Sequence, residues 1–229
     1  MTSLALGRLV GALFLLAFLC YGIGGLLVTS VTSADDVLAS VSAQEPRLTS
    51  GALLMLANSV VVVAIGVLVR EVVRRYDPLV ATAYLVARGV EATVLAVGVV
   101  AVLVLVPVAA APGADAALAT ALRAANDVGF QVAMLGLALG SVLLCRALLR
   151  YGLVPRWLAV GGVVGYATFG LGAALEILGM PVGVALAVPG GLFEVAFGIF
   201  LLRHGFPHGP DTGRQAPHID RSHASAAAR

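Results

Sequence analysis

The sequence predicts an all-α, polytopic membrane protein built as a bundle of six transmembrane helices. Composition is the first observation: of 229 residues, 60% are apolar and only 11% are charged, whereas a soluble domain has about 45–50% apolar and about 25% charged residues. The second observation is the mean hydropathy of +1.04, which agrees with the composition. The third observation is six apolar stretches, each long enough for the roughly 20 residues that a membrane-spanning helix needs. A water-soluble globule, a disordered chain and a disulfide scaffold are therefore excluded.

The apolar stretches set the predicted spans. They cover approximately residues 9–31, 48–69, 79–106, 128–149, 158–178 and 182–202. Strands are excluded because alternating segments of about ten residues are absent. The first apolar run is longer than the roughly 7–15 residues of a signal-peptide core, so we expect a retained helix. Residues 1–203 should form one transmembrane domain, and the lipid bilayer is the expected partner.

The arginines predict the orientation. All 14 basic residues are Arg, and most of them fall on the side that would hold both termini. Arg47 and Arg123 fall on the other side, and Arg88 lies within a span. Because cytoplasmic loops carry the excess of positive charge, we expect cytoplasmic N- and C-termini. We expect the cell membrane of a bacterium as the location, and no nucleic-acid partner, since the basic residues form no patch.

The C-terminal segment, residues 204–229, differs from the rest in composition. It is rich in Pro, Gly, Ser and Ala and contains His204, His208, His218 and His223. A metal-binding tail is one interpretation, but nothing there fixes a coordination geometry, so we expect a disordered cytoplasmic tail. Cys20 and Cys145 lie in apolar runs and are expected to be buried apolar side chains. No metal site and no cofactor is predicted.

Ionisable residues inside the spans are the candidate functional residues. A charge near the bilayer centre costs at least about 2.5–3.5 kcal/mol, so each such group needs a partner, water or a neutral form. The four that stand out are Arg88, Glu91, Glu176 and Glu194. Secondary polar candidates, mostly toward the outer half, are Asn58, Asn126, Asp127 and Gln131.

Their spacing suggests a polar cluster. Arg88 and Glu91 are three positions apart, so they share a helix face and can form an ion pair. Glu194 lies at a similar predicted depth and could be a second partner of Arg88, because a guanidinium offers five donors. Glu176 is predicted near the outer interface, where water hydrates it. The cluster either clamps the third and sixth spans together or serves as a proton or ion relay.

Glycine and proline suggest further features of the spans. Pro189–Gly191 predicts a kink or an unwound turn in the sixth span, and a broken helix beside a carboxylate is typical of transporter sites. Three spans plus three of opposite orientation also fit an inverted repeat. Small-residue pairs four apart predict close helix packing, within the bundle or in a homo-oligomer. These pairs are Gly7/Gly11, Gly136/Gly140 and Gly161/Gly165.

Two functions fit these residues. The first is a small-solute or ion/proton-coupled transporter with a central Arg/Glu site. The second is a non-catalytic structural or regulatory bundle whose Arg/Glu cluster only holds helices together. A membrane enzyme with an unfamiliar carboxylate site is a weaker third. Enzyme motifs such as H-E-x-x-H, G-x-S-x-G and Gly-rich phosphate loops are missing from the sequence, so no enzyme is expected.

Five ordered segments resemble a bacterial membrane family known as domain of unknown function 4386. They are GRLVGALFLLAFLCYGIGG, YLVARGVEATVLAVG, LVPRWLAVGG, LEILG and PGGLFEVAFGIFLLRHGF. The resemblance covers about Arg8 to Phe206. It implies a multi-pass membrane protein with polar motifs at Arg88, Glu91, Glu176 and Glu194, and it implies no known activity.

Overall fold

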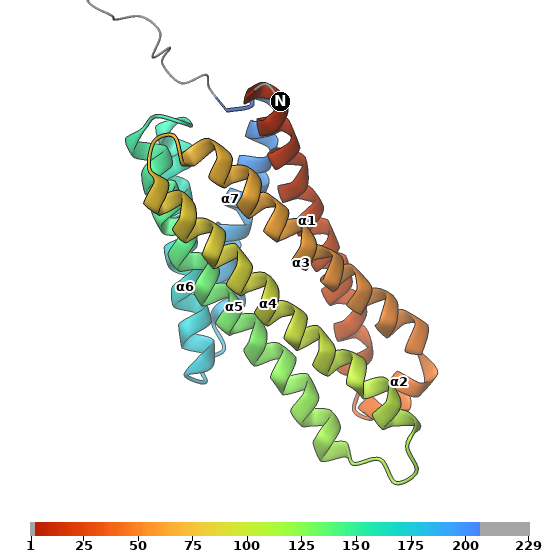
Figure 1. The fold of residues 1–229 in the computed structure, drawn as a ribbon. Helices are drawn as coiled ribbons and strands as arrows, with labels where there is room; N and C mark the ends of the chain where they lie inside the picture. The colour runs from red at the N-terminus through yellow and green to blue at the C-terminus, as the bar shows by residue number, and fades with distance from the viewer. Residues whose placement is uncertain (1–2, 207–229) are drawn as a thin grey trace, which may run out of the picture.

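Helices are the only regular secondary structure in the part of the chain that the structure describes. The structure is a computed structural model that describes residues 3–206 (Figure 1). This range contains no strand, and its helices are α1 Ser3–Thr32, α2 Val37–Ala43, α3 Glu45–Val73, α4 Pro78–Ala110, α5 Ala116–Arg150, α6 Arg156–Ile177 and α7 Gly183–His204. All except α2 are long and apolar enough to cross a membrane. The predicted class, an all-helical bundle with six spans, is confirmed, while most of the predicted tail lies outside the described residues.

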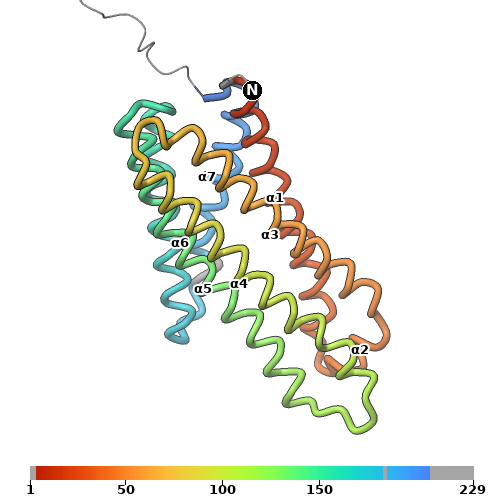
Figure 2. The backbone as a smooth tube through the Cα atoms, in the orientation of Figure 1, coloured from red at the N-terminus to blue at the C-terminus, as the bar shows by residue number. Residues whose placement is uncertain are grey.

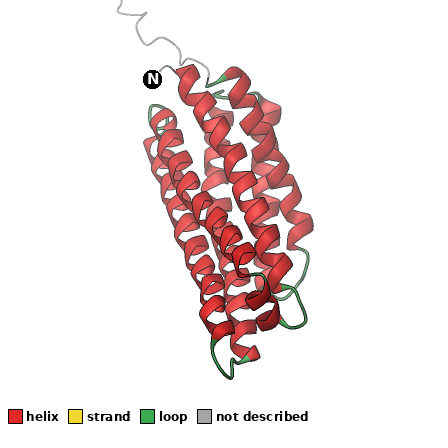
Figure 3. Cartoon of the chain, turned by 90° about the vertical axis from the view of Figure 1, so that its right-hand side faces the viewer, coloured by secondary structure: helices red, strands yellow, loops and turns green. Residues whose placement is uncertain are grey.

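The six long helices form a closed ring. Each of α1, α3, α4, α5 and α6 packs against the next long helix in the chain, and α7 packs back against α1. Figure 3 shows the long helices running along one common axis. A ring of six places α4 and α7 on opposite sides. A side chain that joins these two helices must therefore cross the interior of the bundle.

Short polar side chains fix where several helices begin. The carboxylates of Asp36, Asp77 and Asp115 accept hydrogen bonds from the backbone N–H groups of Ala39, Val80 and Ala117, respectively. An Asp at this position satisfies a donor that the first helical turn leaves free. At the other end of a helix, Gly179 adopts φ 83°, a left-handed conformation that glycine adopts without a Cβ clash, and this turns the chain from α6 to α7.

The helices differ in length, and the longest extend beyond the predicted spans. α4 has 33 residues and α5 has 35, whereas α6 and α7 have 22 each. At 1.5 Å per residue this is about 50 Å against about 33 Å. Pro107 and Arg123, which the sequence placed in a break between spans, lie inside α4 and α5. At this extended end, α2 covers a second small core, which includes Val31, Val41 and Leu105.

The predicted unwound turn in the sixth span is absent. Helix α7 continues through Pro189, Gly190 and Gly191 without interruption. Proline lacks only one donor, and a membrane helix tolerates this loss where neighbouring helices support the backbone. That support is close here, because a Cβ on Gly165 of α6 would lie 2.9 Å from the carbonyl oxygen of Pro189.

Glycines bring α1 into contact with two different neighbours. Near its start, a Cβ on Gly11 would lie 2.8 Å from the backbone nitrogen of Leu202 in α7. Farther along, a Cβ on Gly24 would lie 2.7 Å from the carbonyl oxygen of Gly51 in α3. Figure 2 shows the consequence: the first turns of α1 and the last turns of α7 lie together at the end that holds the N-terminus, and away from this end the two helices run apart.

Candidate functional site

Three polar side chains lie at the same depth in the bundle. Arg88 is ten positions from the first residue of α4, Tyr166 is ten from the first residue of α6, and Glu194 is ten from the last residue of α7. These helix ends share one end of the bundle, so each residue is about 15 Å from it at 1.5 Å per residue. Because the hydrocarbon core is about 30 Å thick, the three meet near its middle.

Arg88 lies at the centre of this cluster. Its Nη1 donates to both oxygens of Glu91, at 2.9 Å to Oε2 and 3.2 Å to Oε1. Its Nε donates to the hydroxyl of Tyr84 at 2.8 Å, and its Nη2 donates to Oε1 of Glu194 at 3.4 Å. The predicted ion pair with Glu91 and the predicted second contact with Glu194 are thus both present.

Glu194 receives a second hydrogen bond from another helix. The hydroxyl of Tyr166 donates to Oε1 of Glu194 at 2.8 Å. Arg88 and Glu91 are almost fully buried, at 2% and 4% exposure, whereas the Glu194 side chain retains 21%. Glu194 is therefore the one carboxylate of the pair that remains accessible.

Aromatic rings surround the guanidinium. The Cζ of Arg88 lies 5.3 Å from the ring centroid of Phe14 in α1 and 5.3 Å from that of Tyr84. These distances are within the roughly 6 Å range of a cation–π contact. A buried charge that loses water needs such partners together with its hydrogen bonds. The cluster thus ties α1, α4, α6 and α7 together around one cation.

A cavity of about 420 Å³ adjoins the cluster. Residues from all six long helices line it, and Arg88, Glu91 and Glu194 form part of its wall. Most of the remaining wall is apolar, with Asn58 as an additional buried polar group. A mainly apolar cavity with a few convergent polar groups is the usual form of a ligand site.

On the other side of the cluster, toward the end that holds Arg203, the interior is packed. The side chains of Val73, Leu148 and Leu201 are fully buried there. They belong to the larger of the two hydrophobic cores. The cavity is therefore closed at this end of the bundle.

The structure does not place all the predicted residues at the site. Glu176 lies on α6 ten positions past Tyr166, about 15 Å farther along the helix, and it does not line the cavity. Among the secondary candidates, only Asn58 does. Asp127 is exposed, and its Oδ2 lies 3.9 Å from Nε of Arg123. Asn126 packs instead against Gly98 of α4, and Gln131 is half-buried outside the cavity lining.

Sequence reasoning missed three residues of the site. Tyr84 had a usable signal, because it lies four positions before Arg88 and so on the same helix face. Tyr166 had a weaker one: it is a tyrosine in the middle of a span, where its hydroxyl needs a partner. Phe14 had no such signal, since an aromatic residue in an apolar run is usually part of the hydrophobic core.

The charges of the cluster do not balance. Arg88 carries one positive charge, and Glu91 and Glu194 carry one negative charge each when ionised. These are the charged residues that line the cavity within the described chain. The ionised cluster therefore has a formal charge of −1, which a bound proton or a bound cation would neutralise. The accessible place for either is Glu194.

The comparisons with known proteins gave one match. A family model described as "Domain of unknown function (DUF4386)" matches residues 9–205 of the chain. No curated protein and no solved structure was found to match the chain. The matched range contains the whole polar cluster and every residue of the cavity wall.

Proposed function

We propose that this chain, which belongs to the DUF4386 family, a domain of unknown function, is a non-enzymatic transporter that moves a small solute or ion across the membrane. In this proposal, Arg88, Glu91 and Glu194 form the binding site, and Glu194 exchanges a proton for the solute. The chain itself is a multi-pass membrane protein with six spanning helices.

The observation that carries the proposal is the position of the cavity. It lies inside a ring of membrane-spanning helices, and a partly exposed carboxylate at mid-depth forms part of its wall. An ionisable group inside a bundle of membrane-spanning helices is by default a candidate for a solute or ion pathway. The closed end supports the same function, because a transporter must open its site to one side at a time.

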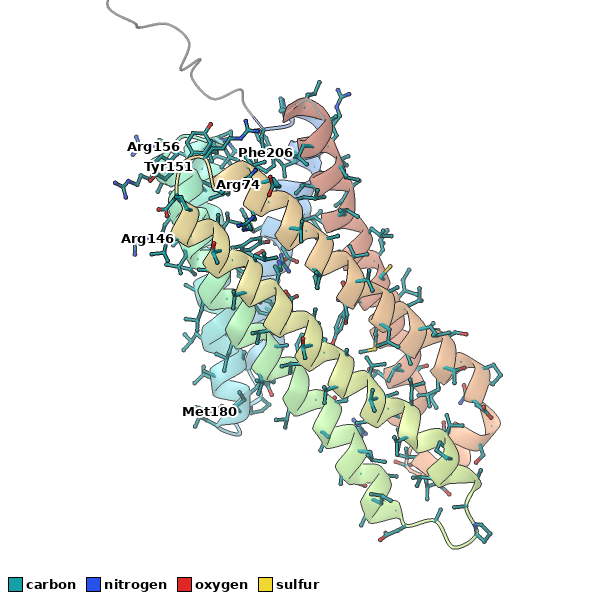
Figure 4. The ribbon with its side chains drawn as sticks, in the orientation of Figure 1. Arg74, Arg146, Tyr151, Arg156, Met180 and Phe206 are labelled. Carbon is teal, nitrogen blue, oxygen red and sulfur yellow. The ribbon has the colours of Figure 1, made fainter. Side chains whose placement is uncertain are left out.

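The arginines support an orientation for this transporter. Figure 4 shows Arg74, Arg146 and Arg156 gathered at one end of the bundle, while Met180 lies at the opposite end. The positive-inside rule favours a cytoplasmic location for the arginine-rich end. We propose that both termini are cytoplasmic, that the membrane is a bacterial cell membrane, and that the cavity lies in the half away from the cytoplasm.

Flux measurements test the transport function directly. The purified chain is reconstituted into liposomes that contain a pH-sensitive dye, and alkali cations, ammonium, simple amines and simple carboxylates are added one at a time. Neutral amines and acids cross a bilayer unaided, so the signal is the change in internal pH beyond that in protein-free liposomes, and we expect at least one solute to give it with the wild-type protein. Glu194→Gln should abolish this signal, because it removes the charge and the exchangeable proton.

A matched control separates the site from the rest of the bundle. Glu176→Gln makes the same chemical change on α6, outside the cavity wall, and should leave the signal unchanged. If Glu194→Gln and Glu91→Gln both transport at the wild-type rate, the transport site is not this cluster.

The burial of Arg88 favours a second candidate function, a structural or regulatory bundle. The guanidinium contacts side chains of α1, α4 and α7 and is 2% exposed, as expected of a clamp. In that case Glu194→Gln should lower the temperature of thermal unfolding, and no solute should move in any variant. Transport by the wild type that is lost in Glu194→Gln, while this variant still folds, favours the transporter.

A further inference from the structure

The cavity has an opening on the side of the bundle. Twenty-one residues line it, and those classed as exposed belong to two helices only: Phe18 and Gly22 of α1, and Val188 and Leu192 of α7. The exposed fractions of Phe18, Val188 and Leu192 are 49%, 53% and 66%. We call these four residues the mouth.

The mouth exists because α1 and α7 separate after a close contact. At the arginine-rich end, Gly11 and Gly198 allow the two backbones to touch. Beyond it, α1 turns to α3 through Gly24, and α7 lies against α6 through Gly190. A Cβ placed on Gly22 would have no neighbouring atom within 4 Å. The separation is thus built into the packing of both helices.

The mouth faces hydrocarbon. Leu192 is 12 positions from the end of α7, and Gly22 is 19 positions from the start of α1, which corresponds to about 18 Å and about 28 Å from the arginine-rich end. Both depths fall within the span that crosses the hydrocarbon core. A molecule that enters here comes from among the acyl chains.

The wall opposite the mouth favours a positive charge. The donors of Arg88 are engaged by Tyr84, Glu91 and Glu194, so little of the guanidinium is left to bind an anion. The ionised cluster has an excess of one negative charge, and Glu194 is its accessible member. Aromatic side chains, which attract cations through their ring faces, also line the cavity: Phe14, Phe18, Tyr21, Phe130 and Phe169.

We propose that the cavity takes a lipophilic cation, an ammonium head on an alkyl or aryl chain, and that this ligand enters from the bilayer through the mouth. The head binds at Glu194, and the apolar chain lies along the cavity and out between α1 and α7. Phe18 lies across this route, since its Cε2 would be 3.7 Å from a Cβ on Gly191. This inference rests on the proposed transport function and names its class of substrate.

Three probes separate the head from the tail. The full-length chain is placed in lipid nanodiscs, with empty nanodiscs as the blank for partitioning. Saturable binding is measured for dodecyltrimethylammonium, for dodecyl sulfate, which has the same tail and a negative head, and for tetramethylammonium, which has the same head and no tail. We expect saturable binding of dodecyltrimethylammonium, with affinity at least about tenfold above that of either other probe. Dodecyl sulfate lacks the attraction of a cationic head to Glu194 and to the aromatic ring faces, and tetramethylammonium lacks the apolar chain that the cavity would bury.

Variants test the residues. Glu194→Gln should weaken binding of dodecyltrimethylammonium at least about tenfold, because the Coulomb attraction between the carboxylate and the cationic head is lost. Gly22→Trp should block the mouth from the α1 side, where an added Cβ meets no atom within 4 Å, and Val188→Trp should do so from the α7 side. The matched controls are Gly25→Trp, which has the same open surroundings outside the cavity lining, and Val164→Trp, an equally exposed site on α6. Both controls should bind as the wild type does.

The outcomes separate the proposed transport function from the narrower inference that the substrate is a lipophilic cation. Equal binding of dodecyl sulfate, or wild-type binding by both Gly22→Trp and Val188→Trp, overturns the lipophilic cation and its lateral route. If tetramethylammonium is instead transported in a way that depends on Glu194, the transport function stands without this inference. If dodecyltrimethylammonium binds as expected but does not cross a liposome membrane, the binding site stands and transport fails.

Discussion

Arg88 and Glu194 are 106 positions apart in the sequence, and their side chains meet at 3.4 Å. They belong to α4 and α7, which occupy opposite positions in the ring of six helices. Their contact therefore crosses the centre of the bundle. It lies between the packed core at the arginine-rich end and the cavity on the other side, so a change at this contact should affect both the stability of the bundle and the shape of the site.

Removal of the arginine should destabilise the protein. Arg88→Ala leaves Glu91 and Glu194 without their cation, and the loss of one partner of a buried ion pair costs about 3–5 kcal/mol. Thermal unfolding in detergent measures the change. Arg74→Ala is the control: Arg74 lies 2.7 Å from Glu71 in an exposed pair, which is worth about 0–1 kcal/mol. Equal unfolding temperatures for the two variants would contradict a stabilising role of the cluster.

Much of this cluster could be predicted from the sequence. Three ionisable residues stand in otherwise apolar spans: Arg88, Glu91 and Glu194. A charge in hydrocarbon is costly, so each of them needs a partner. Because Arg88 and Glu91 are three positions apart on one helix, their ion pair could also be predicted. Glu176 does not share the site, because its position near the end of α6 puts it too far along the helix axis.

The hydroxyl of Tyr166 should matter for both stability and binding. Tyr166→Phe removes the donor to Glu194, and a hydrogen bond to a charged group contributes about 1.5–3 kcal/mol. We expect a lower unfolding temperature and weaker binding of dodecyltrimethylammonium. Tyr151→Phe is the control, since the structure gives its hydroxyl no hydrogen bond within residues 3–206 and it lies at the arginine-rich end. If Tyr166→Phe unfolds and binds as the wild type does, the hydrogen bond from Tyr166 to Glu194 contributes nothing to stability or binding.

The two carboxylates of the cluster should differ in chemical reactivity. Dicyclohexylcarbodiimide is an apolar reagent that enters the bilayer and modifies accessible protonated carboxyl groups. The Glu194 side chain is 21% exposed and lines a cavity that opens to the bilayer, whereas that of Glu91 is 5% exposed. We expect mass spectrometry to find the adduct on Glu194, and Glu194→Gln to remove it. An adduct on Glu91 of the wild-type protein would contradict the assignment of the accessible carboxylate.

The helix contacts show where sequence reasoning stops. The spacing of Gly7/Gly11 and of Gly161/Gly165 is the same, so both pairs predicted close packing. In the structure Gly11 contacts α7 and Gly7 contacts Gly205 and Phe206 just beyond it. Of the second pair only Gly165 contacts α7, and a Cβ on Gly161 would meet nothing within 4 Å. A spacing defines a helix face but not what lies opposite. The ring order that closes α7 on α1, and with it the cavity, follows from contacts that no single segment encodes.

The α1–α7 contact gives the last prediction. A Cβ on Gly11 would lie 2.8 Å from the backbone nitrogen of Leu202, so a larger side chain must push the helices apart. Overpacking of this kind costs about 1–3 kcal/mol. Gly11→Leu should therefore lower the unfolding temperature, whereas Gly25→Leu on the same helix has open space and should not. Since α1 and α7 frame the mouth, Gly11→Leu should also change binding of dodecyltrimethylammonium, measured at a temperature where the variant is folded. If the two variants unfold and bind alike, the contact at Gly11 does not hold α1 against α7.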